Sequence, residues 1–225
     1  MCGRFTIAAG AEFIGKYFEI ETGMPDITPT WNAAPSSNLP VVHAQLGQRQ
    51  CQLMKWGLIP SWLKTPDSKY KMINAKMETL TEKPSYRTAF KSRRCLIPAS
   101  GFYEWHTENG GKQPYYITHE TDELLAFAGL WEVWKGDNII QSFTIITRDA
   151  DETMARIHQR MPVILPATSF DQWLDPDNKD TQSLSTLMQT VAVPLKLQKV
   201  SKAVNNPRND APDLIKPLQS DTKNP

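Results

Sequence analysis

Apolar residues fall at helical spacing near the start of the chain and in short runs through its middle. Between residues 11 and 18 they recur at i, i+1, i+4 and i+5, which predicts a short amphipathic helix. Similar patterns predict further helices over residues 78–82, 84–94, 149–158, 169–174 and 181–190. Apolar and aromatic-rich runs bounded by turn residues predict strands over residues 41–44, 52–56, 95–97, 101–106, 115–118, 124–134, 139–147, 161–165 and 195–200.

These elements predict a single α+β domain over residues 1–218. Glycine-containing turns separate several neighbouring runs, which favours a curved, largely antiparallel β-sheet or barrel-like core with peripheral helices. Residues 22–40 are rich in Pro, Thr, Asn and Ser and predict an ordered loop. The polar residues 219–225 are expected to form a frayed C-terminal tail.

Composition narrows the class of protein. The 225 residues are 40% hydrophobic, an ordinary globular value, and no apolar run approaches a membrane span. The N-terminal segment lacks the apolar core of a signal peptide, so we expect a cytoplasmic protein, nucleoid-associated if bacterial. Cys2, Cys51 and Cys95 are too few and too widely spaced for a disulfide framework or a metal site. Zinc-hydrolase, serine-hydrolase and P-loop motifs are missing, so we expect no cofactor or metal.

Cys2 is the first candidate for chemistry. Its small side chain favours removal of Met1, which would leave a terminal amine and a thiol on adjacent carbons. The amine, with a pKa near ~8, can form an imine with an aldehyde, and the thiol can then close a five-membered thiazolidine. The alternative is that Cys2 is an ordinary residue near the terminus.

Glu104 is the second candidate, because aromatic residues surround it. In a strand, Glu104 shares one face with Phe102, while Tyr103 and Trp105 share the other. Desolvation among aromatic rings would raise the pKa of its carboxyl and suit it to general acid–base catalysis. The alternative is an exposed glutamate at a sheet edge.

His158 and Asn74 are two further candidates. His158 ends a predicted helix, where the helix dipole would favour the imidazolium for proton transfer; a capping histidine is the alternative. Asn74 could orient an amine or a sugar oxygen, although asparagine in a loop also serves turn formation.

Basic and aromatic residues gather unevenly along a chain whose net charge is +1. Lysines follow Trp62, a second basic cluster spans residues 91–94, and Arg4 and Arg160 adjoin two chemical candidates. Basic groups for phosphates and an aromatic platform for a base are typical of single-strand binders. Solvated lysines and a core tryptophan would give the same pattern.

Ten segments in order resemble the SOS-response-associated peptidase (SRAP) family along nearly the whole chain. They are CGRF (2–5), WNAAP (31–35), WGLIPSW (56–62), NAKMET (74–79), RCLIP (94–98), GFYEW (101–105), FAGLWE (127–132), TIIT (144–147), HQRMPV (158–163) and VSKAVN (200–205). The resemblance implies the SRAP fold and a monomer with no obligate protein partner and no membrane association. It also implies a protein that binds single-stranded DNA and captures the aldehyde of an abasic site as a thiazolidine crosslink.

The resemblance also assigns residues. It implies that the catalytic set is Cys2, Asn74, Glu104 and His158. It implies that the DNA-binding set is Arg4, Asn32, Pro35, Trp62, Lys76 and Arg160. Lysine at 76 departs from the family's usual arginine and loses bidentate phosphate geometry, and Leu63 replaces a frequent second aromatic residue.

The implied imine stage would also permit strand scission as a lyase, and the family name implies cleavage of the Met1–Cys2 bond by the protein itself. A cellular aminopeptidase is the alternative for that cleavage. Two other classes stay open: an N-terminal-nucleophile amidotransferase or hydrolase, which also begins Cys-Gly, and a non-catalytic single-stranded DNA-binding module.

Overall fold

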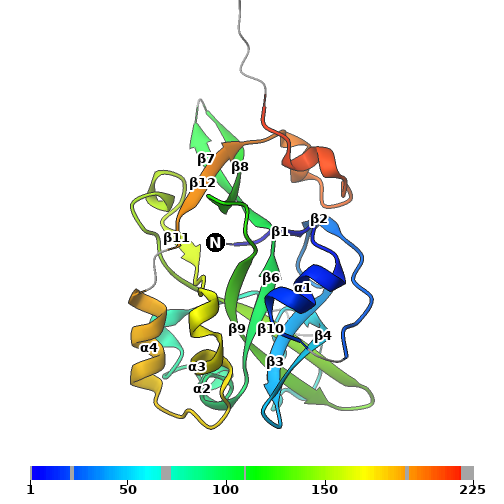
Figure 1. Ribbon diagram of the computed structural model, residues 1–225, viewed down its shortest axis with the longest axis vertical. Helices are drawn as coiled ribbons and strands as arrows, with labels where there is room; N and C mark the ends of the chain where they lie inside the picture. Colours follow the sequence, from blue (N-terminus) through cyan, green and yellow to red (C-terminus); the bar gives the residue numbers. More distant parts are fainter. Residues whose placement is uncertain (1, 21–22, 67–71, 109, 191–192, 219–225) are drawn as a thin grey trace, which may run out of the picture.

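The computed structural model describes residues 2–20, 23–66, 72–108, 110–190 and 193–218. It is a single α+β domain, as predicted, and its strands form two sheets (Figure 1). The first sheet has the order β12-β8-β7-β1-β2. Its strands are β1 (Phe5–Ile7), β2 (Thr30–Ala33), β7 (Gly101–Glu108), β8 (Gly111–His119) and β12 (Leu195–Lys199).

The second sheet closes on itself. Its order is β11-β10-β4-β3-β6-β9, and β5 also pairs with β10. The additional pairing of β9 with β10 closes β10, β4, β3, β6 and β9 into a barrel. All its pairings are antiparallel except those of β4 and β5 with β10. Its strands are β3 (Asn38–Gln45), β4 (Gln48–Trp56), β5 (Asn74–Lys76), β6 (Arg94–Ala99), β9 (Leu125–Lys135), β10 (Ile139–Asp149) and β11 (Arg160–Pro162).

Helices lie around this barrel. They are α1 (Ala11–Tyr17), α2 (Pro84–Ser92), α3 (Phe170–Leu174) and α4 (Thr181–Thr190), and the short 3₁₀ turns are η1 (Met77–Thr79), η2 (Met154–Arg156), η3 (Ala167–Ser169), η4 (Lys202–Asn205) and η5 (Pro212–Ile215). Figure 1 shows α2, α3 and α4 together at one end of the barrel, with η4 and η5 at the other end of the molecule. No helix within the described residues is long and apolar enough to cross a membrane.

β1 lies where the two sheets meet, and it carries the start of the chain to the centre of the molecule (Figure 1). It pairs with β7 and β2, while the ring of Phe5 packs on Trp56 of the barrel with 5.0 Å between centroids. Gly101, which pairs with Thr6, has no room for a side chain, because a Cβ there would lie 2.7 Å from the carbonyl oxygen of Ile117 on β8. The fold therefore fixes the first residues between both sheets.

Four predicted elements differ from the observed ones. The loop predicted over residues 22–40 contains β2, because Thr30–Ala33 pairs with β1. The helix predicted over 149–158 is wrong, since β10 runs on to Asp149 opposite Arg160 and leaves one 3₁₀ turn. The helix predicted over 78–82 is the single 3₁₀ turn η1, and the helix predicted over 84–94 ends at Ser92. The tail at 219–225 lies outside the described residues.

Candidate active site at the start of the chain

Cys2 lies just before β1 and is completely buried. The antiparallel pairing of Phe5 with Phe102 carries the preceding residues along β7, and Tyr103 N donates to Arg4 O at 3.0 Å. The Cys2 thiol lies 3.9 Å from Arg4 O, its weak acceptor. Burial, followed by the negative charge of Glu104, raises the pKa of this thiol well above its ordinary value. Cys2 is therefore a neutral thiol at pH 7, adjacent to a carboxylate.

Asn74 fixes the backbone of Cys2. β5 is parallel to β10, with Asn74 opposite Ile145, and Asn74 Nδ2 donates to Cys2 O at 2.9 Å. The other amide atom, Asn74 Oδ1, is buried and accepts no hydrogen bond from any described residue. A buried amide oxygen without a donor is costly, so this atom is an acceptor available to a group near Cys2.

Glu104 is 3% exposed, in agreement with its predicted desolvated position and not with an exposed edge. The predicted division of β7 into two faces is also confirmed. Phe102 packs in the main core, whereas Tyr103 and Trp105 pack with a second cluster that includes Val204 and η5. The side chain of Glu104 therefore lies on the core-facing side of the strand, the side from which its charge acts on the Cys2 thiol.

His158 lies in the short connection between η2 and β11. With η2 reduced to a single turn, the dipole of a longer helix does not act on His158 as predicted. Arg160 N donates to His158 Nδ1 at 2.9 Å, and Arg160 O lies 3.1 Å from the same nitrogen. His158 Nδ1 can accept the first bond when it carries no hydrogen and can donate the second when it carries one.

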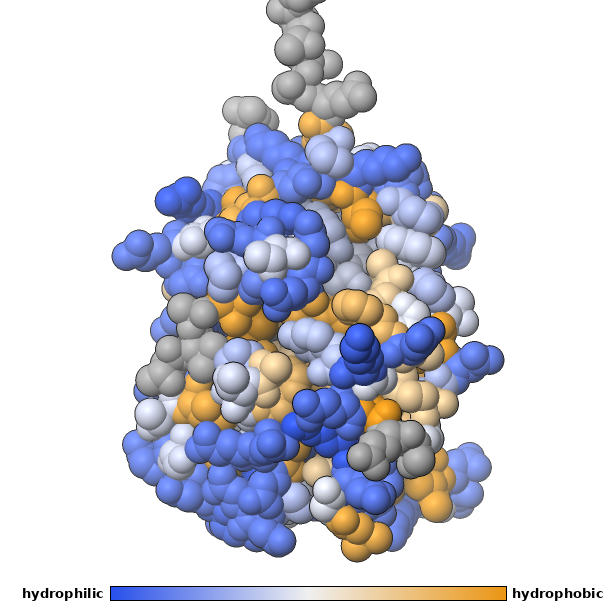
Figure 2. Space-filling view, in the orientation of Figure 1, coloured by the Kyte–Doolittle hydropathy of each residue, from blue (hydrophilic) through white to orange (hydrophobic). Residues whose placement is uncertain are grey.

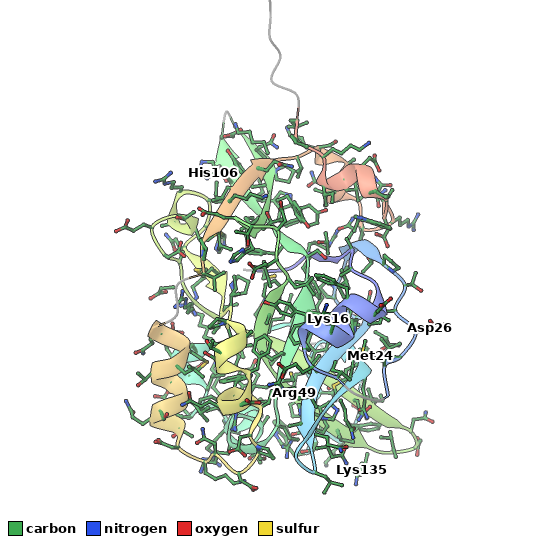
Figure 3. The ribbon with its side chains drawn as sticks, in the orientation of Figure 1. Lys16, Met24, Asp26, Arg49, His106 and Lys135 are labelled. Carbon is green, nitrogen blue, oxygen red and sulfur yellow. The ribbon has the colours of Figure 1, made fainter. Side chains whose placement is uncertain are left out.

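The segment that precedes His158 contacts β7. His106, two residues beyond Glu104 on the same face of β7, has its Nδ1 3.4 Å from Ile157 O. Figure 3 labels His106 beside the yellow-green segment that leads into β11. Cys2 is thus linked to Asn74 by a hydrogen bond and to Glu104 by charge, and the loop of His158 adjoins the strand of Glu104.

Arg4 and Asn32 form a connected pair near this site. Arg4 Nη1 donates to Asn32 Oδ1 at 2.7 Å and to Val204 O at 3.2 Å. Asn32 is 4% exposed, and its Nδ2 lies within hydrogen-bonding distance of three carbonyl oxygens, those of Val204, Asn206 and Asn209. The predicted DNA-binding residue Asn32 is therefore used inside the protein, where it orients Arg4.

Arg160 also has internal partners. Its guanidinium bonds both carboxylate oxygens of Glu78, at 2.7 and 3.0 Å, one oxygen of Asp149 at 2.6 Å, and Thr147 O at 2.7 Å. Sequence reasoning missed Glu78 and Asp149. Glu78 lies two residues after the predicted DNA-binding residue Lys76 in the NAKMET segment, and this spacing could have indicated it. The contact of Asp149 with Arg160 depends on the pairing of β10 with β11, which no sequence pattern indicates.

The remaining predicted DNA-binding residues lie nearer the surface. Trp62 is 62% exposed, and the carbonyl of the next residue, Leu63, accepts a hydrogen bond from Trp134 Nε1 at 2.8 Å. Lys76 is exposed at the start of η1, and Pro35 is half-buried after β2. The face in Figure 2 is mainly hydrophilic with small hydrophobic patches between.

A pocket of about 440 Å³ lies elsewhere, between the β3–β4 turn and α3. Its Arg49, labelled in Figure 3 well below His106, is already paired with Glu19 and Asp171. The described residues hold no group of three or more His, Cys, Asp or Glu side chains that could bind a metal ion.

Comparison with known proteins identifies the family to which the chain belongs. The family model described as SOS response associated peptidase (SRAP) matches residues 1–207. The chain belongs to the SRAP family. It is 41% identical over 221 residues to the abasic site processing protein YoqW of Bacillus subtilis, covering 96% of this chain and 99% of that one.

Two further similar proteins share less of their sequence with this chain. The abasic site processing protein HMCES of Xenopus tropicalis is 37% identical over 220 residues, which cover 83% of this chain and 65% of that one. A crystal structure of a Bacteroides thetaiotaomicron protein, 22% identical, superposes with a TM-score of 0.86 over 97% of this chain and 100% of that one. The SRAP fold is therefore present in this chain.

Proposed function

We propose that this SRAP protein processes abasic sites in DNA and that Cys2 is its reacting residue. Two relatives carry the name abasic site processing protein, which supports this class of function. The observation that carries the proposal is the setting of Cys2: its carbonyl is bound by Asn74, and its thiol interacts with the charge of Glu104. A thiol, a neighbouring amine and an acid–base group are what aldehyde capture requires.

The proposed chemistry begins with removal of Met1, which frees the α-amine of Cys2. The amine attacks C1′ of the ring-opened abasic sugar, and the carbinolamine loses water to give an imine. The Cys2 sulfur then adds to C1′, while the thiol proton ends on the former imine nitrogen. The products are one thiazolidine and one water, so each protein molecule reacts once.

Each neighbouring residue has a proposed task. Asn74 Oδ1, which lacks a donor among the described residues, accepts a hydrogen bond from the freed amine. Glu104 accepts the proton of the Cys2 thiol, which burial keeps protonated at neutral pH, and passes it to nitrogen. His158 supplies the proton that the sugar ring oxygen needs for ring opening.

The DNA is proposed to be single-stranded. Arg4, Lys76 and Arg160 contact phosphates, Trp62 supports a base, and Pro35 borders the strand. Asn32 acts through Arg4, because its own amide is buried in four internal contacts. This arrangement requires no second copy of the chain.

Two further activities belong to the proposal. The imine can undergo β-elimination, which would cleave the strand as a lyase before the thiol closes the ring. The same site would also hydrolyse the Met1–Cys2 bond with one water. Mass spectrometry of chains synthesised without an aminopeptidase tests the second activity: loss of Met1 in the natural chain and its retention in Glu104→Gln is expected.

The decisive experiment incubates processed protein with a single-stranded oligonucleotide that contains one abasic site, followed by a denaturing gel. A heat-stable shifted band that requires Cys2 is expected. Cys2→Ser should form an imine that borohydride traps, without a stable adduct in its absence. No shifted band with the natural chain would refute the crosslinking proposal, and an equally stable Cys2→Ser adduct would refute ring closure.

Glu104→Gln separates chemistry from binding. Loss of a general acid–base group is expected to slow crosslinking by about 10²-fold or more. Affinity for the same oligonucleotide without the abasic site should change less than about threefold, since Glu104 is buried. Equal losses in both would make Glu104 a structural residue. Ammonia release from glutamine would instead favour an amidotransferase, and binding without any adduct would favour a non-catalytic module.

A further inference from the structure

In the protein without DNA, the N–H groups on Nη1 and Nη2 of Arg160 already donate to partners within the protein. A guanidinium has five N–H groups, two on each terminal nitrogen and one on Nε. Nη1 donates to Glu78 and Asp149, and Nη2 donates to Glu78 and Thr147 O. The fifth group, on Nε, is buried and has no partner within the described part of the chain. A phosphate can therefore bind Arg160 only by replacing one of these partners.

The two carboxylates differ in how firmly they are bound. Glu78 receives two parallel bonds, one on each oxygen, and these bonds lower the pKa of its carboxyl. Asp149 makes one bond to Arg160, and its side chain is 87% exposed. Single ion pairs exposed to water contribute little, whereas bidentate pairs fix geometry. Asp149 is thus the partner that is easily displaced.

We propose that Asp149 occupies the place of a DNA phosphate oxygen on Arg160, and that single-stranded DNA binds by displacing it while Glu78 keeps the guanidinium oriented. This inference rests on the proposed DNA-binding function and adds the exchange that accompanies it. The free cluster of one guanidinium and two carboxylates has a net charge of −1, which disfavours an anion for as long as Asp149 stays on Arg160. A phosphate oxygen takes over the bond that Asp149 gives up, while the exposed Asp149 carboxylate turns to water.

The exchange also occurs next to the candidate proton donor. Arg160 N donates to His158 Nδ1, and Asp149 is paired with Arg160 across β10 and β11. The side chain that binds phosphate and the backbone that orients His158 therefore belong to one residue. Glu78 is a positioning residue in this account, because it touches Arg160 and not the DNA.

Asp149→Asn tests the exchange, because it preserves shape and removes the charge. The quantity to measure is the affinity of each variant for an undamaged, fluorescently labelled single-stranded oligonucleotide, by anisotropy at several salt concentrations. Asp149→Asn is expected to bind about two- to fivefold more tightly, the range that exposed ion pairs contribute. The matched control is Glu152→Gln. It removes one negative charge from an exposed side chain that lies three residues after Asp149 in the sequence. It should change affinity by less than about 1.5-fold.

A double-mutant cycle with Arg160→Ala completes the test. The gain from Asp149→Asn should vanish when Arg160 is absent, since the competition is then absent. Glu78→Gln should weaken binding and reduce the salt slope by about 0.7, the value for one lost phosphate contact on single strands. Glu78→Asp should partly restore the slope.

Three results would overturn the inference. They are equal gains in Asp149→Asn and Glu152→Gln, a gain that persists in Arg160→Ala, and an unchanged salt slope in Glu78→Gln. If the natural chain bound and crosslinked abasic DNA but the variants gave one of these results, this inference would fall and the proposed function would stand. If the natural chain bound no single-stranded DNA, both would fall.

Discussion

Replacing Asn32 with alanine removes a buried amide that joins the first strands to the last segment of the chain. Its oxygen accepts the bond from Arg4 Nη1, and its nitrogen lies near three carbonyl oxygens, those of Val204, Asn206 and Asn209. An NH₂ group has two hydrogens, so we count two neutral bonds and one charge-assisted bond. At about 1 kcal/mol for each neutral bond and about 1.5–2 kcal/mol for the charged one, the free energy of unfolding should fall by about 3.5–4 kcal/mol.

Urea unfolding followed by tryptophan fluorescence measures this loss. The matched control is Asn206→Ala, which removes the same amide from an exposed position where it accepts one bond from Arg208 N. The control should lose less than about 1 kcal/mol. A loss in Asn32→Ala within about 0.5 kcal/mol of the control would refute the bond count, because it would mean that the buried amide contributes no more than an exposed one.

Three other predictions concern Lys76, His43 and the three buried thiols. Lys76→Arg should bind single-stranded DNA about two- to fivefold more tightly with an unchanged salt slope, because the guanidinium adds a second bond without adding charge; weaker binding would contradict this. Burial lowers the pKa of His43, so the unfolded chain binds a proton that the folded chain disfavours. Stability should be full above about pH 6.5 and fall below it, and His43→Gln should lose less between pH 7.5 and 5 by urea unfolding. Burial raises the pKa of the thiols of Cys2, Cys51 (to about 12) and Cys95, so iodoacetamide at pH 7.5 should label the native chain far more slowly than the unfolded chain; rapid native labelling would contradict this.

Hydrophobic pattern alone predicted most of the fold. The α4 helix and the β3–β4 and β9–β10 hairpins lie where periodicity placed them, because local pattern and final burial agree there. Elements that depend on distant partners were not predictable. β2 exists through its pairing with β1, and the end of β10 replaces a predicted helix because β11 pairs with it.

The sequence predicted which residues belong to the candidate site better than it predicted how they contact one another. The segment around Glu104 indicated desolvation, and the structure buries it as expected. No pattern along the chain could indicate that Asn32 would be enclosed or that Asp149 would reach Arg160, because these contacts form across 172 to 177 residues in the first case and between paired strands in the second. Charge and residue type identify candidate groups, but tertiary contacts decide which groups are exposed.

The bond between Arg4 and Val204 spans 200 positions of the chain, which has a consequence for biosynthesis. During translation, at roughly 5–20 residues per second, this bond cannot form for about 10–40 s after Arg4 has been made. Throughout that interval Arg4, two residues from Cys2, lacks its partner on η4. A cellular aminopeptidase that acts on the nascent chain therefore meets the first residues before the contact between Arg4 and Val204 ties them to the last segment of the chain.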